Sequence, residues 1–203
     1  LQESHALCLA ERQYGLAAGR DDFAVLDVGA GVGLGVMSGG RLLTGHSGLA
    51  GEIGHLTAVA DGGRLCGCGN RGCLETLCSD AALAWRVSQR LGRDVTIDDV
   101  IELARSGADP LAAELHDAAR YLAVAAAAVV NLFNPSTLFV HSRQFEADGS
   151  LFDRLVEETR RRALPPSFAD CRLVRARGTK RQGAVAGAIR QLTNAVVPGL
   201  EHV

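Results

Sequence analysis

The sequence predicts an α/β fold, in which buried strands alternate with amphipathic helices. Apolar runs typical of strands occur at 23–28 and 137–141, and the long segments between and after them have helical spacing with clear start signals. The composition agrees, because 47 % apolar residues and a formal net charge of −2 over 203 residues are those of an ordinary globular domain. A near-neutral chain gives no reason to expect a polyanion as the main partner.

The first part of the chain is predicted to form a helix followed by a β-hairpin. Residues 3–14 have helical spacing, and 23–28 is a short apolar run that enters a glycine-rich turn. Residues 29–37 continue from that turn, and a second turn leads into 41–43, which predicts the hairpin. The following residues, 44–72, are rich in glycine and irregular, and they contain the residues with candidate chemistry.

Helices dominate the rest of the chain. Ser79 with Asp80 is expected to cap a helix that ends near Leu91, and Thr96 another that runs through Arg105. Asp109-Pro110 is a start signal for a helix that ends near Phe133, before Asn134-Pro135. The remaining predicted elements are a strand at 137–141, a helix at 150–162, a strand at 171–176 and a last helix from Thr179 to 195.

Three of the six cysteines lie close together and form a candidate metal site with a histidine. Cys66, Cys68 and Cys73 stand among glycines, and His55 precedes them. Zinc prefers four nitrogen or sulfur ligands in a tetrahedron, and a filled shell predicts a structural role. Zinc binding, worth about 10 kcal/mol or more, can offset the entropy lost when this glycine-rich loop is ordered. The alternative is a set of reduced, non-ligating cysteines beside a chance histidine.

Two carboxylates flank this candidate metal site. Glu52 lies just before His55, and Glu75 just after Cys73, so a metal ion would hold both near one place. Such a pair suits sugar hydroxyls, since each carboxylate accepts one or two O–H groups, and His55 can offer its second ring nitrogen. The alternative is structural: Glu52 caps a turn and Glu75 opens the next helix, where a negative charge is favoured.

A glycine loop follows the first predicted strand. Gly29, Ala30, Gly31 and Gly33 could present backbone amides to a phosphate group. The loop lacks the Gly-Lys-Ser/Thr of a Walker motif, and a hairpin rather than a helix follows it. A tight hairpin turn is therefore an equally good interpretation.

Two of these elements together resemble the ROK family, which groups bacterial sugar kinases with sugar-responsive transcriptional repressors. Gly51-Glu52-Ile53-Gly54-His55 is similar to its G-E-x-G-H element, and 66–75 to its C-x-C-G-x-x-G-C-x-E element. The resemblance implies one lobe of an actin-like (RNase H-like) ATPase with a glycine-rich zinc-binding loop. Residues 1–203 would form the single C-terminal lobe, and the start at Leu1 leads us to expect that the first lobe and any helix-turn-helix domain lie outside the chain.

The resemblance also implies roles for individual residues. His55, Cys66, Cys68 and Cys73 would hold structural zinc, and Glu52, His55 and Glu75 would bind the sugar. Members of the family dimerise largely through this lobe, and their last helix packs on the first lobe.

The chain departs from the kinase pattern at three places. Glu3 stands where kinases carry the Asp that acts as general base, and a displacement of about 1 Å can cost about 10²-fold in rate. Ala30 removes the hydroxyl of the usual Gly-Thr-Gly. His141-Ser142-Arg143 replaces a glycine pair that lets adenosine approach the backbone. These changes argue against efficient use of ATP and Mg²⁺, which the chain would need only as a kinase.

We therefore expect the sugar-binding and dimerisation lobe of a regulator, with DNA contacted only through a domain outside this chain. The alternative is an ATP-dependent kinase of glucose or an N-acetyl amino sugar. A zinc-dependent nucleic-acid module is a third hypothesis, motivated by the arginine run at 160–162 and the arginines at 172, 175, 177 and 181, although a solvated helix face is the simpler explanation. No secretory signal opens the chain, and the apolar run at 122–130 is too short to cross a bilayer, so we expect a cytoplasmic protein.

Overall fold

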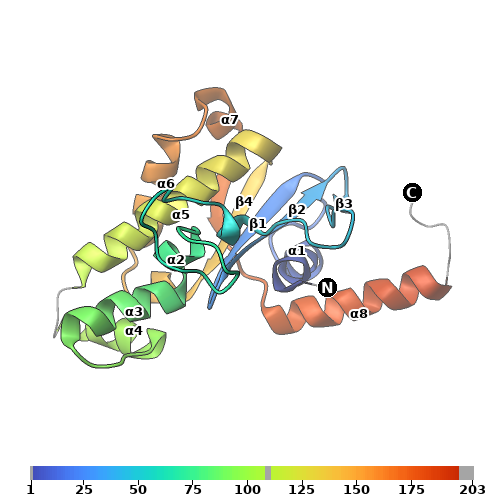
Figure 1. The fold of residues 1–203 in the computed structure, drawn as a ribbon. Coiled ribbons are helices and arrows are strands. Elements are labelled where there is room, and N and C mark those ends of the chain that lie inside the picture. Colours follow the sequence, from blue (N-terminus) through green and yellow to red (C-terminus); the bar gives the residue numbers. More distant parts are fainter. Residues whose placement is uncertain (1, 108–110, 197–203) are drawn as a thin grey trace.

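The computed structural model describes residues 2–107 and 111–196, which form a five-stranded mixed sheet with helices on both faces (Figure 1). The predicted α/β class is confirmed. The elements run in the order α1 (Glu3–Tyr14), β1 (Phe23–Val28), β2 (Val32–Ser38), β3 (Arg41–Leu42), η1 (Ile53–His55), α2 (Glu75–Cys78), α3 (Asp80–Leu91), α4 (Ile97–Ser106), α5 (Ala112–Phe133), β4 (Thr137–Ser142), η2 (Arg143–Glu146), α6 (Leu151–Arg160), α7 (Pro165–Asp170), β5 (Arg172–Arg175) and α8 (Lys180–Val196).

The strands lie in the order β3-β2-β1-β4-β5. β1 and β2 form the predicted antiparallel hairpin, whereas β1 pairs with β4, and β4 with β5, in parallel. β1 is central and buried along its whole length, as its apolar sequence predicts. The β1–β4 register places Asp27 opposite His141, so these two side chains leave the same face at the carboxyl end of the sheet.

Alternating residues of the central strands supply two separate cores. Leu26 and Val140 face α3 and α5 in the larger core. Phe23 and Phe139 face α1 and α8 in the smaller one, where their rings meet edge to face with centroids 5.8 Å apart. Figure 1 accordingly shows α5 on one side of the sheet and α1 with α8 on the other.

Glycines let α1 approach its neighbours closely. A Cβ atom on Gly35 of β2 would lie 2.5 Å from the carbonyl oxygen of Ser4, and one on Gly183 of α8 would lie 2.4 Å from that of Ala6. Both distances are shorter than any real Cβ contact, so no side chain fits at either position. The first turn of α1, which carries Glu3, therefore lies directly against the sheet and α8.

The predicted helix starts at Ser79 and Thr96 are confirmed. The Ser79 hydroxyl accepts the N–H of Ala82 at 3.1 Å, and Thr96 forms a capping box with Asp99. The predicted start signal at Asp109-Pro110 lies outside the described residues, and α5 begins at Ala112 within them. Within the described part of the chain, no helix is both long and apolar enough to cross a membrane.

Glu11 fastens the segment before α8 to α1. Its side chain is completely buried, and one carboxylate oxygen accepts the backbone N–H groups of Arg177 and Gly178. The other oxygen accepts the N–H of Leu16 at 3.0 Å. Three backbone donors, of which the Gly178 N–H is buried and the other two are partly buried, thus depend on one side chain.

Replacing Glu11 with alanine is expected to lower the free energy of unfolding by about 3 kcal/mol, because it leaves the buried N–H of Gly178 and two partly buried N–H groups without their acceptor. Urea-induced unfolding measures the change. Glu102→Ala, which removes an exposed carboxylate from α4, is the matched control and should stay within about 0.5 kcal/mol of wild type. Equal losses in the two variants would contradict this account of Glu11.

Candidate metal centre and acidic cleft

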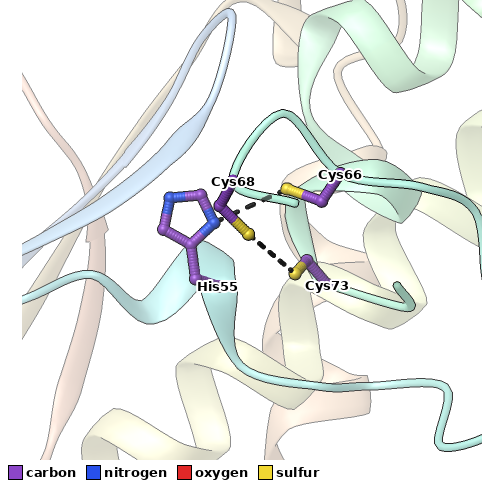
Figure 2. Close-up of side chains that lie close together, drawn as sticks. All are labelled: His55, Cys66, Cys68 and Cys73. Carbon is purple, nitrogen blue, oxygen red and sulfur yellow. Dashed lines mark hydrogen bonds between the residues drawn. The ribbon is translucent and has the colours of Figure 1, made fainter. Parts of the chain in front are cut away.

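His55, Cys66, Cys68 and Cys73 bring their ligand atoms within 4.8 Å of one another, and Figure 2 shows the imidazole and the three thiols facing a common centre. The His55 Nδ1 to Cys66 Sγ distance is 3.6 Å, and the Cys68 to Cys73 Sγ distance is 3.7 Å. A tetrahedral zinc site with Zn–S near 2.3 Å and Zn–N near 2.0 Å has edges of about 3.8 Å between sulfurs and about 3.5 Å between sulfur and nitrogen. The cluster is therefore able to hold a metal ion, and zinc fits its size and donor set.

The backbone around these ligands is shaped by turns and close contacts. His55 ends η1, and a turn carries Cys66 and Cys68, with the Cys66 N–H donating to Asn70 O at 2.7 Å. Gly72 has a φ of +74°, and a Cβ atom there would lie 1.9 Å from Val59 O. Only glycine meets both conditions, so the chain can deliver Cys73 to the cluster.

The three thiols have different surroundings. Burial raises the pKa of Cys66 to about 12 and also raises the pKa of Cys73. The backbone N–H of Asn70 stabilises the Cys68 thiolate and lowers its pKa. Two of the thiols are thus protonated at neutral pH without a metal ion, and ion binding would release their protons. The other cysteines, Cys8, Cys78 and Cys171, are buried away from the cluster.

A cleft of about 280 Å³ lies beside the cluster, at the carboxyl end of β1. Four carboxylates line it, from different parts of the chain: Glu3 at the start of α1, Asp27 at the end of β1, Glu52 before η1 and Glu75 at the start of α2. The structure thus brings together three residues that the sequence singled out, Glu3, Glu52 and Glu75.

His55 connects the metal cluster to two of these carboxylates. Its Nδ1 faces the cluster, and its Nε2 lies 3.6 Å from a Glu52 oxygen. A Glu75 oxygen lies 3.8 Å from Nδ1 and accepts the Cys66 thiol at 3.0 Å. Glu75 also opens α2, as the structural alternative predicted, so this residue both begins a helix and lines the cleft.

The glycine loop forms a tight hairpin turn. The Gly29 N–H donates to Gly31 O at 2.9 Å, and Gly29 O accepts the N–H of Asp80 at 2.8 Å. Gly31 and Gly33 line the cleft, whereas Gly29 and Ala30 lie in the turn outside its lining. The hairpin interpretation is confirmed, and a role in phosphate binding stays a prediction.

Sequence reasoning missed Lys180 altogether, and it missed the pairing of His141 with Asp27 at this end of the cleft. Lys180 Nζ lies 2.5 Å from Glu3 Oε2 and 3.3 Å from Asp27 Oδ2, and His141 Nδ1 lies 2.9 Å from Asp27 Oδ1. No local sequence pattern marks these pairs, because the partners lie more than 100 residues apart along the chain. Only the parallel pairing of β1 with β4 and the return of α8 to α1 bring them together.

The arginine run that motivated a nucleic-acid hypothesis is paired within its own helix. Arg160, Arg161 and Arg162 bond to Glu157 and Glu158, one turn earlier in α6. These are ion pairs on a solvated helix face, which is the simpler explanation given for the run.

The fold and the site define a class of protein: an actin-like α/β lobe with a His/Cys metal cluster beside an acidic cleft. A family model described as "ROK family" matches residues 2–194, and the chain belongs to that family. The resemblance drawn from residues 51–55 and 66–75 is therefore confirmed.

Relatives include both regulators and kinases. The Escherichia coli (strain K12) DNA-binding transcriptional dual regulator NagC is 33 % identical over 98 % of this chain and 51 % of its own length. A crystal structure of a ROK family transcriptional regulator, a homolog of the E. coli MLC protein, matches with a TM-score of 0.83 and 32 % identity, over 93 % of this chain and 50 % of that one. The ROK hexokinase from Thermus thermophilus matches with a TM-score of 0.81 and 32 % identity, over 92 % and 64 %. The chain spans about half the length of the regulators it matches.

Replacing Cys68 with serine is expected to reduce bound zinc from about one ion per chain to less than half of that, because a hydroxyl is a poor substitute for a thiolate ligand. Elemental analysis of the purified protein measures this. Cys171→Ala removes a cysteine outside the cluster and should keep the full metal content. Equal zinc in the Cys68 variant and the wild type would show that the cluster does not hold the ion.

Proposed function

We propose that this chain is the sugar-binding and dimerisation lobe of a ROK-family transcriptional regulator, with a structural zinc ion in the cluster. The observation that carries the proposal is the placement of Glu52 and Glu75 in one cleft, on either side of His55. A rigid frame that holds two acceptors and a ring nitrogen together suits a ligand with several hydroxyl groups.

The hydrogen bonds around Glu52 support a polar ligand. One oxygen of Glu52 accepts the side-chain amide of Gln2 at 2.6 Å, and the other lies on the side of His55. If His55 binds the metal through Nδ1, its Nε2 carries the proton and lies on the side of Glu52. The cleft thus offers both acceptors and a donor, which a sugar hydroxyl can use together because it donates and accepts.

The residues at the positions where a kinase would carry its catalytic base and bind its nucleotide favour a regulator. Glu3, at the position of the kinase general base, is already held by the ammonium group of Lys180. His141 stands at the end of β4 where kinases have glycine, and its ring is held against Asp27. Ala30 supplies no hydroxyl to the turn. A sugar hydroxyl would therefore find no free base, and a nucleotide would find no open approach to the backbone.

Dimerisation and DNA binding belong to the proposal and are supported by the names of the relatives and by an exposed apolar surface. Leu49, Leu56 and Leu65 expose apolar side chains on the segment that carries the metal ligands, and such surface suits contact with a second copy. DNA would be contacted by another part of the full-length protein. Sugar in the cleft would then change the relative population of two arrangements of the dimer.

The kinase alternative has one observation in its favour. Glu3 lines the same cleft as Glu52 and Glu75, so a carboxylate does lie beside the proposed sugar. ATP-dependent phosphorylation of a sugar by the full-length protein, at enzyme-like rates, would establish the kinase and overturn the regulator.

Glu75→Gln is expected to weaken sugar binding by about tenfold or more and to reduce the thermal shift that a sugar produces, because an amide accepts fewer O–H groups than a carboxylate. A panel of glucose, xylose and N-acetylglucosamine with the full-length protein, monitored by differential scanning fluorimetry, measures this.

Glu102→Gln is the control for the loss of one negative charge, and it should behave as wild type. Zinc analysis of the Glu75 variant should give the wild-type content, which separates sugar binding from metal binding. If no sugar shifts the wild-type protein, the proposed function fails.

A further inference from the structure

The cysteines of the metal cluster differ in their access to solvent. Cys68 is exposed, whereas the other five cysteines of the chain are buried. Cys68 stands on a turn that the Gly69 N–H closes by donating to Cys66 O at 3.0 Å. The turn is open on its outer side, since a Cβ atom on Gly67 or Gly69 would meet nothing within 4 Å. Cys68 is therefore the cysteine that a dissolved reactant reaches first.

A second thiol lies beside this exposed one. The Cys73 Sγ atom is 3.7 Å from that of Cys68, and a dashed line joins the two sulfurs in Figure 2. A disulfide bond is about 2.0 Å long, so the sulfurs would have to approach each other by roughly 1.7 Å. The chain between them can adapt, because Gly69 and Gly72 both have a positive φ and the turn at Cys68 is exposed.

The third thiol of the cluster is engaged elsewhere. Cys66 donates to a Glu75 oxygen at 3.0 Å and lies 3.6 Å from His55 Nδ1. It is only 4 % exposed, so a reactant in solution does not reach it directly. The cluster thus contains one exposed thiol with one close neighbour, Cys68 with Cys73, and a third thiol that is held on the side of the acidic cleft.

The cysteines outside the cluster serve as internal controls. Cys8 and Cys78 have no exposed surface, and Cys171 is 6 % exposed. The Cys78 thiol also donates to Leu74 O at 3.3 Å. Reaction at these three residues requires the fold to open, whereas reaction at Cys68 does not.

We propose that Cys68 and Cys73 form a site of reversible oxidation, at which a hydroperoxide joins them in a disulfide and zinc leaves the cluster. As a metal ligand Cys68 is a thiolate, and its sulfur attacks one peroxide oxygen. An S–O bond forms, the O–O bond breaks, and the departing oxygen takes up a proton to leave as water or an alcohol. The Cys73 thiolate then attacks the Cys68 sulfenic acid, so that the S–S bond forms and the S–O bond breaks with loss of hydroxide.

This sequence is balanced, because the two cysteines together lose a pair of electrons and the peroxide gains that pair. It leaves only His55 and Cys66 as ligands, and two ligands do not hold zinc in its preferred tetrahedron. The modification goes beyond the proposed function, since it needs neither a sugar nor DNA.

Peptide mapping of the full-length, zinc-loaded protein after treatment with hydrogen peroxide tests the inference. Trypsin cleaves after Arg64 and Arg71, which places Cys68 and Cys73 on separate peptides. A linked pair of these peptides is expected, with fragmentation assigning the bond to Cys68 rather than Cys66. About one zinc ion should be released for each linked pair, as measured with a chromogenic chelator. Dithiothreitol and added zinc should restore the separate peptides and the metal content.

The metal-free protein should give the same linked peptides, which tests the thiol pair independently of the ion. Cys68→Ser should yield no linked pair, and Cys171→Ala, which removes a buried cysteine outside the cluster, should behave as wild type. The wild-type peptide map decides the inference even if the Cys68 variant does not fold. A bond to Cys66, sulfinic acid at Cys68 without a link, or unmodified cysteines with retained zinc would each overturn it.

Discussion

Residues 43–74, which join β3 to α2, depend for their shape on the convergence of one imidazole and three thiols. Within this described segment the regular structure amounts to η1 and two isolated bridges, Thr57 to Cys73 and Leu65 to Arg71. Ordering a glycine-rich chain costs about 1–2 kcal/mol per residue, and this segment buries little apolar surface to offset that cost. A metal ion at the cluster would add a strong constraint to the backbone hydrogen bonds that the segment makes within itself.

The position of the acidic cleft follows from this constraint. Glu52 lies just before η1 and Glu75 directly follows the segment, and the cluster brings their near neighbours His55 and Cys73 together. Arg64 connects this segment to α3, because its guanidinium lies 3.7 Å from the centre of the Trp85 ring on that helix. A metal ion at the cluster would therefore stabilise the cleft and the contact with α3 together.

The opposite wall of the cleft is built by the packing of helices on the sheet. Glycines at 35 and 183 let α1 lie against both β2 and α8, which places Glu3 within reach of Lys180. Glu11 fixes the segment before α8 by accepting three backbone N–H groups. The two walls of the cleft thus have different origins: a local cluster on one side and long-range packing on the other.

This difference explains how much could be predicted from the sequence. The Phe23–Val28 strand, the caps at Ser79 and Thr96 and the four candidate metal ligands are encoded by residues that lie close together along the chain. The structure confirms the strand and the caps, and it brings the four side chains into a cluster that is able to hold a metal ion. The short helices η2 and α7 were missed because each is too brief to show a period.

Lys180 and the pairing of His141 with Asp27 were missed for another reason. Their roles depend on the register of β1 with β4 and on the return of α8, which no local pattern specifies. The sequence could not decide between the structural and the ligand-binding interpretations of Glu75, and the structure shows that a helix start and a place in the cleft are compatible.

The most direct test of the account is the sugar affinity of the full-length protein before and after removal of its metal ion. Chelation is expected to weaken sugar binding by about tenfold or more while far-UV circular dichroism shows that the sheet and its helices persist, and added zinc should restore the affinity. The single tryptophan, Trp85, reports in parallel on the contact with Arg64. A metal-free protein that binds sugar as tightly as the zinc-loaded protein would contradict the claim that the cluster holds the cleft in place.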